Sequence, residues 1–297
     1  MKCTAIVVTY NGMKWYDKCF GSLSKSSFPL EIIAVDNKST DDTINYLSEN
    51  YASVKTIQND KNYGFAKANN IALNIAYQNN ADYYFLLNQD AWIENDTVEK
   101  LIQFSVNNPE YGVISPVHLT GDRKHFDIGF LIYFNQYSET LHAYENLFLK
   151  KTEPDYYDSQ FVNAAAWLVT RKCIEMVGGF DTIMFRHYGE DSNYCQRVLY
   201  HRLKIAILTS TTICHDREYR KDRPNDKKVN FSVFYANILN GKKVYLKHIL
   251  LLVVKIIYIK YSKDGFIELF FLLTSLQRII KSRRQNKLKN EGIKWFI

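Results

Sequence analysis

Short apolar runs rich in β-branched residues alternate with longer amphipathic stretches through the first 120 residues of this chain. We predict strands at residues 4–9, 31–35, 54–57 and 83–87, and helices at residues 13–26, 41–50 and 65–79. This order is typical of an α/β fold in which parallel strands are joined by helices. Ligands of such sheets bind at the loops after the carboxyl ends of the strands, so we expect the site there.

The pattern is less regular from about residue 110 to residue 220. We predict a strand at 113–117, a hairpin near 126–134, a disordered segment or lid near 145–160, a strand near 161–169, helices at 171–177 and about 190–202, and a strand at 204–208. Residues 216–228 are dense in charge and contain Pro224, which indicates a mobile loop and a boundary. We therefore expect one nucleotide-binding domain over residues 1–228 and a helical extension over 229–297.

Composition excludes several classes of protein. Hydrophobic residues make up 46% and charged residues 23% of the chain, which excludes a disordered or fibrous protein. The five cysteines include no Cys-x-x-Cys pair, so neither a disulfide framework nor a zinc site is indicated. The apolar run at the amino terminus is too short for a signal peptide. We therefore expect a cytoplasmic protein.

The last 70 residues combine apolar and basic side chains. Lys255 and Lys260 interrupt the apolar runs, which stay well short of the roughly 18 apolar residues of a membrane span. Residues 266–280 place apolar side chains at helical spacing. Basic residues are concentrated at the end of this segment and after it: Arg278, Lys281, Arg283, Arg284, Lys287 and Lys289. We expect a helix lying on an anionic membrane surface, at the inner face of the cell membrane, rather than a nucleic-acid partner. The alternative is a helical pair packed on the core or on a second copy in a homodimer.

Three polar motifs follow predicted strands or open a predicted helix. Asp36, after the second strand, can accept a hydrogen bond from a nucleotide, although such residues also cap helices. Asn88-Gln89-Asp90 follows the fourth strand, and Asp90 can supply one hard oxygen ligand to a divalent cation that bridges a diphosphate. Glu190-Asp191 can present a general base, although acids in the first turn of a helix also stabilise its dipole.

Five motifs occur in order over residues 3–216 and together resemble a known family. They are Val7-Val8-Thr9-Tyr10-Asn11, Val35-Asp36-Asn37 with Ser39 and Asp41, the segment Asn62 to Asn70, Leu87-Asn88-Gln89-Asp90, and Gly178-Gly179-Phe180-Asp181 followed by Glu190-Asp191. The chain resembles the inverting glycosyltransferases of family two, which have the GT-A fold, and most closely a branch that includes bacterial rhamnosyltransferases. The resemblance implies a Rossmann-like nucleotide-binding fold with a mixed central sheet.

The resemblance also implies an activity. One sugar would pass from a nucleotide-sugar donor to a lipid-linked or oligosaccharide acceptor in bacterial surface polysaccharide assembly, such as O-antigen or capsule. The first candidate donor is dTDP-rhamnose, and UDP-hexoses are the alternative. A dehydrogenase is disfavoured because Tyr10-Asn11-Gly12-Met13 stands where a G-x-G-x-x-G turn is required. A noncatalytic binding protein is disfavoured because both acids of the Glu190-Asp191 pair are present.

The family motifs carry site assignments onto this sequence. The donor side comprises Thr9, Tyr10, Asn11, Asp36, Asn37, Asp41, Asn62, Gly64, Phe65, Lys67, Asn70, Asn88 and Gln89. Asp90 and His215 match groups that hold Mg²⁺ or Mn²⁺ at the diphosphate. Asn88 replaces the first acid of the metal motif, so we expect the site to hold its cation more weakly until the donor diphosphate arrives. Asp191 matches the catalytic base, with Glu190 as its rival because adjacent helix residues point about 100° apart. We place Trp167, Gly179 and Asp181 on the acceptor side.

Overall fold

The computed structural model describes residues 1–134, 155–185, 188–217, 277–282 and 284. Its strands are β1 (Cys3–Thr9), β2 (Leu30–Asp36), β3 (Lys55–Gln58), β4 (Tyr83–Asn88), β5 (Ala91–Ile93), β6 (Tyr111–Thr120), β7 (Tyr156–Ser159), β8 (Ala166–Thr170) and β9 (Lys204–His215). Its helices are α1 (Met13–Ser24), α2 (Thr43–Asn50), α3 (Gly64–Gln78), α4 (Thr97–Asn107), α5 (Ile128–Phe134), α8 (Arg171–Val177) and α9 (Glu190–Tyr200).

Within these residues, nine strands form one mixed sheet in the order β3-β2-β1-β4-β8-β6-β9-β5, with β7 beside β9. The first four strands of the chain run parallel, and β8 reverses direction between β4 and β6. The predicted α/β class and mixed sheet are confirmed. Each predicted strand and helix of the first 90 residues is present, with ends that differ by one or two residues.

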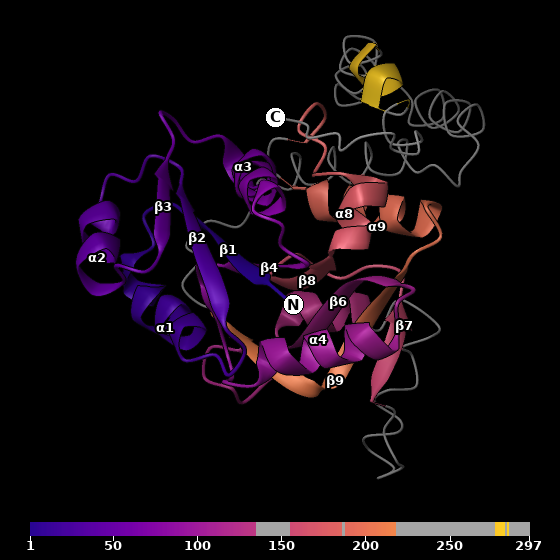
Figure 1. Ribbon diagram of the computed structural model, residues 1–297, viewed down its shortest axis with the longest axis horizontal. Helices are drawn as coiled ribbons and strands as arrows, with labels where there is room; N and C mark the ends of the chain where they lie inside the picture. Colours follow the sequence, from indigo (N-terminus) through magenta and orange to yellow (C-terminus); the bar gives the residue numbers. More distant parts are fainter. Residues whose placement is uncertain (135–154, 186–187, 218–276, 283, 285–297) are drawn as a thin grey trace, which may run out of the picture.

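Helices cover both faces of the sheet (Figure 1). One apolar layer lies between the sheet and α3, α5, α8 and α9, and the other lies between the sheet and α1, α2 and α4. Successive side chains of β1 enter different layers, since Ile6 belongs to the first and Ala5 and Val7 to the second. A strand buried on both faces needs apolar residues at every position, which explains the unbroken apolar run near the amino terminus.

The prediction of a hairpin near residues 126–134 is wrong. The chain reverses earlier, where Leu119 bridges Phe126, and α5 follows. Asp127 caps the amino terminus of this helix, because its carboxylate Oδ1 accepts the backbone N–H of Phe130 at 2.8 Å. The aromatic side chains that suggested strands are instead the buried face of α5, where Phe130 packs against Tyr133 and Phe134.

Other differences concern short or irregular segments. The predicted lid near 145–160 lies partly outside the described residues, but Tyr156–Ser159 is strand β7, paired with β9. The strand expected near 161–169 begins only at Ala166, and the strand expected at 204–208 continues to His215. Elements β5 and α4 had no counterpart in the predictions. Several of these differences involve β9 and its partners β5 and β7, and the three strands that pair with β9, which are β5, β6 and β7, come from distant parts of the chain.

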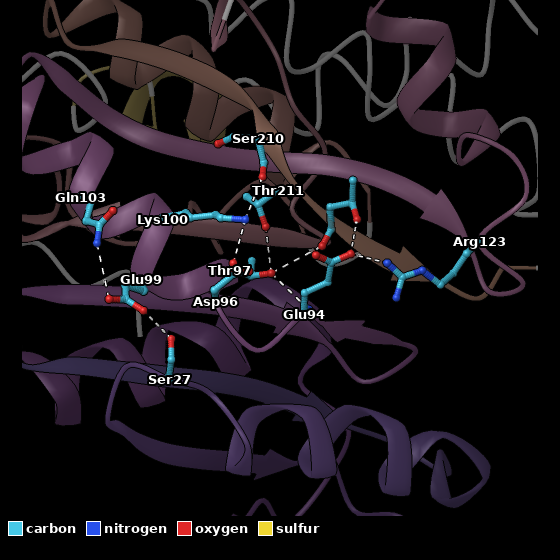
Figure 2. A network of polar contacts seen from close by, with 11 residues as sticks. Ser27, Glu94, Asp96, Thr97, Glu99, Lys100, Gln103, Arg123, Ser210 and Thr211 are labelled. Carbon is cyan, nitrogen blue, oxygen red and sulfur yellow. Dashed lines mark hydrogen bonds and ion pairs between the residues drawn. The ribbon is translucent and has the colours of Figure 1, made fainter.

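A polar network fixes the irregular middle of β9 against the start of α4 (Figure 2). The register between β6 and β9 shifts after Leu208, which leaves residues 209–211 outside the ladder. The buried Thr97 hydroxyl accepts hydrogen bonds from Thr211 Oγ1 at 3.0 Å and from the backbone N–H of Glu94 at 3.1 Å. Glu94 in turn accepts from Thr212 Oγ1 and pairs with Arg123. These contacts hold the strand whose last residue is His215.

Replacing Thr97 by Val should reduce the free energy of unfolding by about 1–3 kcal/mol, because the buried Glu94 N–H and Thr211 hydroxyl lose their acceptor. Thr97→Ser is the matched control, since it keeps the hydroxyl and loses only a methyl group. Urea unfolding, with the midpoint and slope fitted for each variant, measures the difference. Equal destabilisation by Val and Ser would show that packing, and not hydrogen bonding, governs this position.

The carboxyl-terminal extension is described only in part. Residues 277–282 are helical, Ile279 and Ser282 are buried, and Ser282 donates a hydrogen bond to Asp181. Ile280 is exposed on the same segment. Among the described residues, no helix combines the length and the apolar character needed to cross a bilayer. The boundary at residue 228 lies outside the described residues, so the two-part division of the chain stays a prediction.

Candidate active site

The site lies where β1, β2 and β4 end together, since Thr9 pairs with Asp36 and Val8 pairs with Asn88. The Asp36 carboxylate is buried and fully engaged. It accepts hydrogen bonds from Thr9 Oγ1 at 3.0 Å and from the backbone N–H and the hydroxyl of Ser39 at 2.8 and 2.5 Å. Asp36 therefore shapes the loop after β2, where we predict the nucleotide base to bind.

The loops after β1 and β2 hold each other. Asn11 donates its backbone N–H to Ser39 Oγ at 2.9 Å and accepts the backbone N–H of Thr40 at its Oδ1 at 2.8 Å. Asp41 accepts the hydroxyl of Thr43 at 2.5 Å at the start of α2, which is a loop-supporting role. The Tyr10 ring, by contrast, is 44% exposed beside these loops. An exposed aromatic ring at the carboxyl edge is suited to stacking on a nucleobase.

Three predicted donor-side amides use their side chains inside the protein. Asn37 donates to the Gly64 carbonyl and accepts from Asn59 Nδ2 and the Tyr63 N–H. Gln89 accepts the Tyr10 N–H at 2.8 Å and donates to the Tyr10 carbonyl at 3.1 Å. The structure therefore places these amides as supports of the loops that face the site.

The third amide, Asn70, forms two hydrogen bonds with the backbone of Phe180, at 2.7 and 2.8 Å. A Cβ on Gly179 would lie 2.5 Å from Asn70 Oδ1, so only glycine permits this contact. The segments Asn62–Asn70 and Gly178–Asp181, distant in sequence, are thereby joined. At the start of α3, Asn62 accepts the N–H of Gly64, and the Lys67 ammonium lies 4.3 Å from the centre of the Tyr63 ring.

A cavity of about 410 Å³ opens beside the end of β4. Its walls bring together four residues singled out in the sequence, namely Phe65, Asn88, Glu190 and Asp191. They come from α3, β4 and the first turn of α9, which are separated by up to 126 positions along the chain. This cavity is large enough for a sugar ring and its substituents, and it has carboxylates on one wall.

The two carboxyl groups of the cavity have raised pKa values. Burial raises the pKa of Glu190 to about 8, and the neighbouring Asp191 charge adds to the shift. Burial also raises the pKa of Asp191, against the opposing effect of the Ser192 backbone N–H, which donates to Asp191 Oδ1 at 2.7 Å. Gly189, at φ 87°, turns the chain into α9 just before the pair. A desolvated carboxylate of this kind is suited to accept a proton at neutral pH.

Asp90 and His215 lie side by side next to Asn88, which lines the cavity. The buried His215 ring places Nε2 at 3.3 Å from Asp90 Oδ1 and 3.4 Å from Asn88 Nδ2. One carboxylate and one imidazole form a donor set that suits Mn²⁺ or Mg²⁺, with diphosphate and water oxygens completing the shell. Within the described ranges, no cluster of three or more His, Cys, Asp or Glu side chains is arranged to hold a metal.

The residues predicted on the acceptor side do not line this cavity. The Trp167 ring is fully buried and packs against Phe180 and Tyr194. The Gly179 carbonyl accepts from Arg197 at 2.7 Å, and Asp181 Oδ1 accepts the backbone N–H of Ile183 at 2.9 Å. The structure places all three behind the wall that carries Glu190 and Asp191.

Other residues of the cavity were not identified in the sequence. They include Tyr133 of α5, Phe161 and Asn163 before β8, Tyr188 before α9, and Arg217 after β9. Behind them lies Asp127, whose pKa is held at about 2 because His215 and Arg217 outweigh the effect of burial. Arg217 stands two positions after His215, and that proximity is the one signal in the sequence that could have identified it.

Comparisons with known proteins agree with this geometry. The family model described as "Glycosyl transferase family 2" matches residues 4–168. The dTDP-rhamnosyl transferase RfbF of Shigella flexneri is 24% identical over 212 residues, covering 71% of this chain and 68% of the relative. The O-antigen chain rhamnosyltransferase WbaN of Salmonella anatum is 25% identical over 245 residues, covering 78% of this chain and 72% of the relative.

Two solved structures share the fold. S. aureus TarS 1-349 in complex with UDP superimposes with a TM-score of 0.56 at 17% identity, covering 84% of this chain and 68% of that chain. The mannosyltransferase PcManGT from Pyrobaculum calidifontis, in complex with GDP-Man and Mn²⁺, superimposes with a TM-score of 0.56 at 16% identity, covering 96% of this chain and 86% of that chain. At these identities the likeness concerns the fold.

Proposed function

This chain belongs to glycosyl transferase family 2, and from that premise we propose that it transfers one sugar, with inversion, to a saccharide hydroxyl in bacterial surface polysaccharide assembly. It has the GT-A fold and uses a nucleotide-sugar donor. Our first candidate donor is dTDP-rhamnose, supported by the names of the two rhamnosyltransferase relatives. A UDP-hexose is the alternative, supported by the UDP bound to TarS.

The observation that carries the proposal is that Asp191 and Asn88, the last residue of β4, line the same cavity. In the proposed reaction, the Asp191 carboxylate accepts the proton of the acceptor hydroxyl. The bond from that oxygen to the anomeric carbon forms as the bond from carbon to the diphosphate oxygen breaks on the opposite face. The electron pair of the broken bond leaves with the nucleoside diphosphate, and the configuration inverts.

The leaving diphosphate would lie beside Asp90 and His215, where Asn88 reduces the negative charge of the metal motif. A divalent cation bound there would supply Lewis-acid stabilisation to the leaving oxygen. Mn²⁺ in the PcManGT structure supports this assignment. Arg217, which lines the same cavity, adds a fixed positive charge near Asp191 and lowers the pKa of that carboxyl against the effect of burial.

The acceptor would occupy the part of the cavity next to Asn163. Tyr133 donates its hydroxyl to Asn163 Oδ1 at 2.5 Å, and Asn163 Nδ2 is buried with no protein partner among the described residues. The rings of Tyr133, Phe161 and Tyr188 form the rest of this wall. Aromatic faces beside an oriented amide are suited to a sugar ring, which presents apolar C–H faces and hydroxyl edges.

The remaining assignments concern partners of the whole chain. We propose that residues 1–228 form the catalytic domain and that residues 229–297 associate with the anionic inner face of the membrane, where a lipid-linked acceptor would be found. The mixed basic and apolar composition of that extension supports this proposal. Formation of a homodimer through the same extension is the alternative.

The donor can be identified by offering the purified protein a panel of nucleotide sugars and measuring released nucleoside diphosphate. We expect slow hydrolysis of one donor, because water replaces the missing acceptor. This hydrolysis should be faster with Mg²⁺ or Mn²⁺ than with chelator. Release from dTDP-rhamnose alone supports the rhamnosyltransferase assignment, and release from a UDP-hexose transfers it to the alternative. No release and no thermal shift with any donor would contradict the catalytic proposal.

A further inference from the structure

A buried carboxylate stands directly behind the imidazole of His215. Asp127 Oδ2 lies 3.3 Å from His215 Nδ1, on the side of the ring away from Asp90. The same oxygen lies 2.9 Å from Arg217 Nε. Asp127 and His215 are 2% and 1% exposed, so water does not compete for these contacts.

We propose that Asp127 is a positioning residue, which accepts the Nδ1–H of His215 and thereby directs the Nε2 lone pair of that ring toward the space beside Asp90. The proposal rests on the proposed role of Asp90 and His215 in holding a divalent cation at the donor diphosphate. It extends that role to a residue that does not touch the cation or the substrate.

The need for such a residue follows from the chemistry of imidazole. A neutral ring carries one N–H, and the nitrogen that binds a cation must be the other one. A carboxylate that accepts the N–H fixes the tautomer and the orientation of the ring and raises the basicity of the ligating nitrogen. Without it, the proton could reside on Nε2 and be donated to Asp90 Oδ1, 3.3 Å away, and the lone pair would then be on Nδ1, on the far side of the ring from Asp90.

Arg217 offers a competing contact, because its Nε–H donates a hydrogen bond to His215 Nδ1 at 3.2 Å, an arrangement that belongs to the other tautomer of the ring. The Arg217 Nε atom lies closer to Asp127 Oδ2, at 2.9 Å, and a carboxylate oxygen with two lone pairs can accept from both the guanidinium and the imidazole. Guanidinium and imidazole thus converge on one oxygen. Asp127 therefore positions two side chains at the end of β9, of which His215 faces Asp90 and Arg217 lines the cavity.

Contacts with α5 hold the Asp127 side chain in place. Its second oxygen, Oδ1, accepts the N–H of Phe130 in the first turn of α5, and that helix packs its aromatic face into the core. His118 lies edge-on to His215 with ring centres 6.3 Å apart and closes one side of the imidazole. The His215 ring is thus held in place by the protein before any ligand binds.

The test is binding of Mn²⁺, by calorimetry, to the full-length protein saturated with dTDP or UDP. Asp127→Asn keeps the size of the side chain and an oxygen for the Phe130 N–H, but it cannot present a carboxylate to His215. We expect Mn²⁺ affinity to fall about 10- to 100-fold, while nucleotide affinity in chelator stays unchanged. In a double-mutant cycle, Asp127→Asn should add no further loss to His215→Ala.

The outcomes distinguish the positioning role of Asp127 from the cation-binding role of Asp90 and His215. If His215→Ala weakens Mn²⁺ binding and Asp127→Asn does not, the positioning role is overturned and the cation site stands. If His215→Ala changes nothing, the proposed role of His215 fails, and the inference fails with it. Should Asp127→Asn not fold, ¹⁵N spectra of the histidines in the unmodified protein, loaded with Mg²⁺ and dTDP or UDP, decide the matter. His215 must then carry its proton on Nδ1, and a proton on Nε2 overturns the proposal.

Discussion

Replacing Asp191 by Asn is expected to lower turnover by about 10²- to 10⁴-fold and to leave donor binding nearly unchanged. The amide is nearly isosteric with the carboxylate and stays in the cavity wall, but it cannot accept the proton of the acceptor hydroxyl. Turnover is measured as sugar transfer to the acceptor, and donor affinity is measured separately by calorimetry. If donor affinity falls as far as turnover, Asp191 binds the donor and is not the base.

Glu190→Gln is the matched control, because Glu190 is the adjacent acid on the same cavity. A small effect of Glu190→Gln beside a large effect of Asp191→Asn assigns the base to Asp191, and the reverse result assigns it to Glu190. Since burial raises the pKa of both groups, the acid limb of the wild-type pH profile should lie above the ordinary range of a carboxyl group. Its midpoint belongs to the pair, because adjacent carboxyls titrate together.

The raised pKa of Glu190 also predicts how the stability of the control variant Glu190→Gln depends on pH. The pKa of Glu190 is raised from 4.5 to about 8, so its protonated form favours the folded state. That contribution is fully present below pH 4.5 and is lost as the pH rises through 8. Glutamine stays neutral throughout, so Glu190→Gln should melt at a higher temperature than the wild type above pH 8. A variant that is inactive yet at least as stable cannot owe its inactivity to misfolding.

The parallel half of the fold could be predicted from the sequence because its signals are local. Three of its four strands, β1, β2 and β4, are short apolar runs, and the helices between the strands are amphipathic. The segment 126–134 could not be predicted in this way, since its aromatic side chains suit a strand as well as a helix. The Asp127 cap and packing against a core formed by distant strands favour a helix over a strand in this segment. Similarly, β5 has three residues and depends on pairing with β9.

The residues of the candidate site likewise include some that local sequence predicts and others that depend on tertiary contacts. Glu190, Asp191 and Asn88 could be predicted as site residues because they follow a strand or open a helix, and the structure brings them to one cavity. Asn70 resembled them in sequence, but its amide joins α3 to the backbone of Phe180. Polar residues at loop ends serve substrates or backbone groups equally well, and only the tertiary contacts distinguish the two. Asp127 belongs to no motif, because its partners lie about 90 positions away on β9 and beyond.

Replacing Asp90 by Asn is the second change for which we expect a large loss, of about 10²- to 10³-fold in metal-stimulated transfer, because Lewis-acid stabilisation of a leaving oxygen contributes several kcal/mol. Asp90 is the one carboxylate within 3.5 Å of His215 Nε2 among the described residues. With Asn88 beside it, the variant would face the donor diphosphate and its cation without a formal negative charge. Transfer is measured over a Mn²⁺ titration, with chelator as the baseline.

Asn88→Asp tests the same electrostatic argument in the opposite direction, since it restores the acid that the family motif carries at this position. We expect this variant to bind Mn²⁺ more tightly in the absence of nucleotide, because two carboxylates and His215 then converge on one point. The wild type should bind Mn²⁺ appreciably only once the diphosphate contributes its oxygens. If Asp90→Asn keeps full activity and wild-type transfer ignores chelator, Asp90 does not act through a cation, and Arg217 becomes the candidate for stabilising the leaving group.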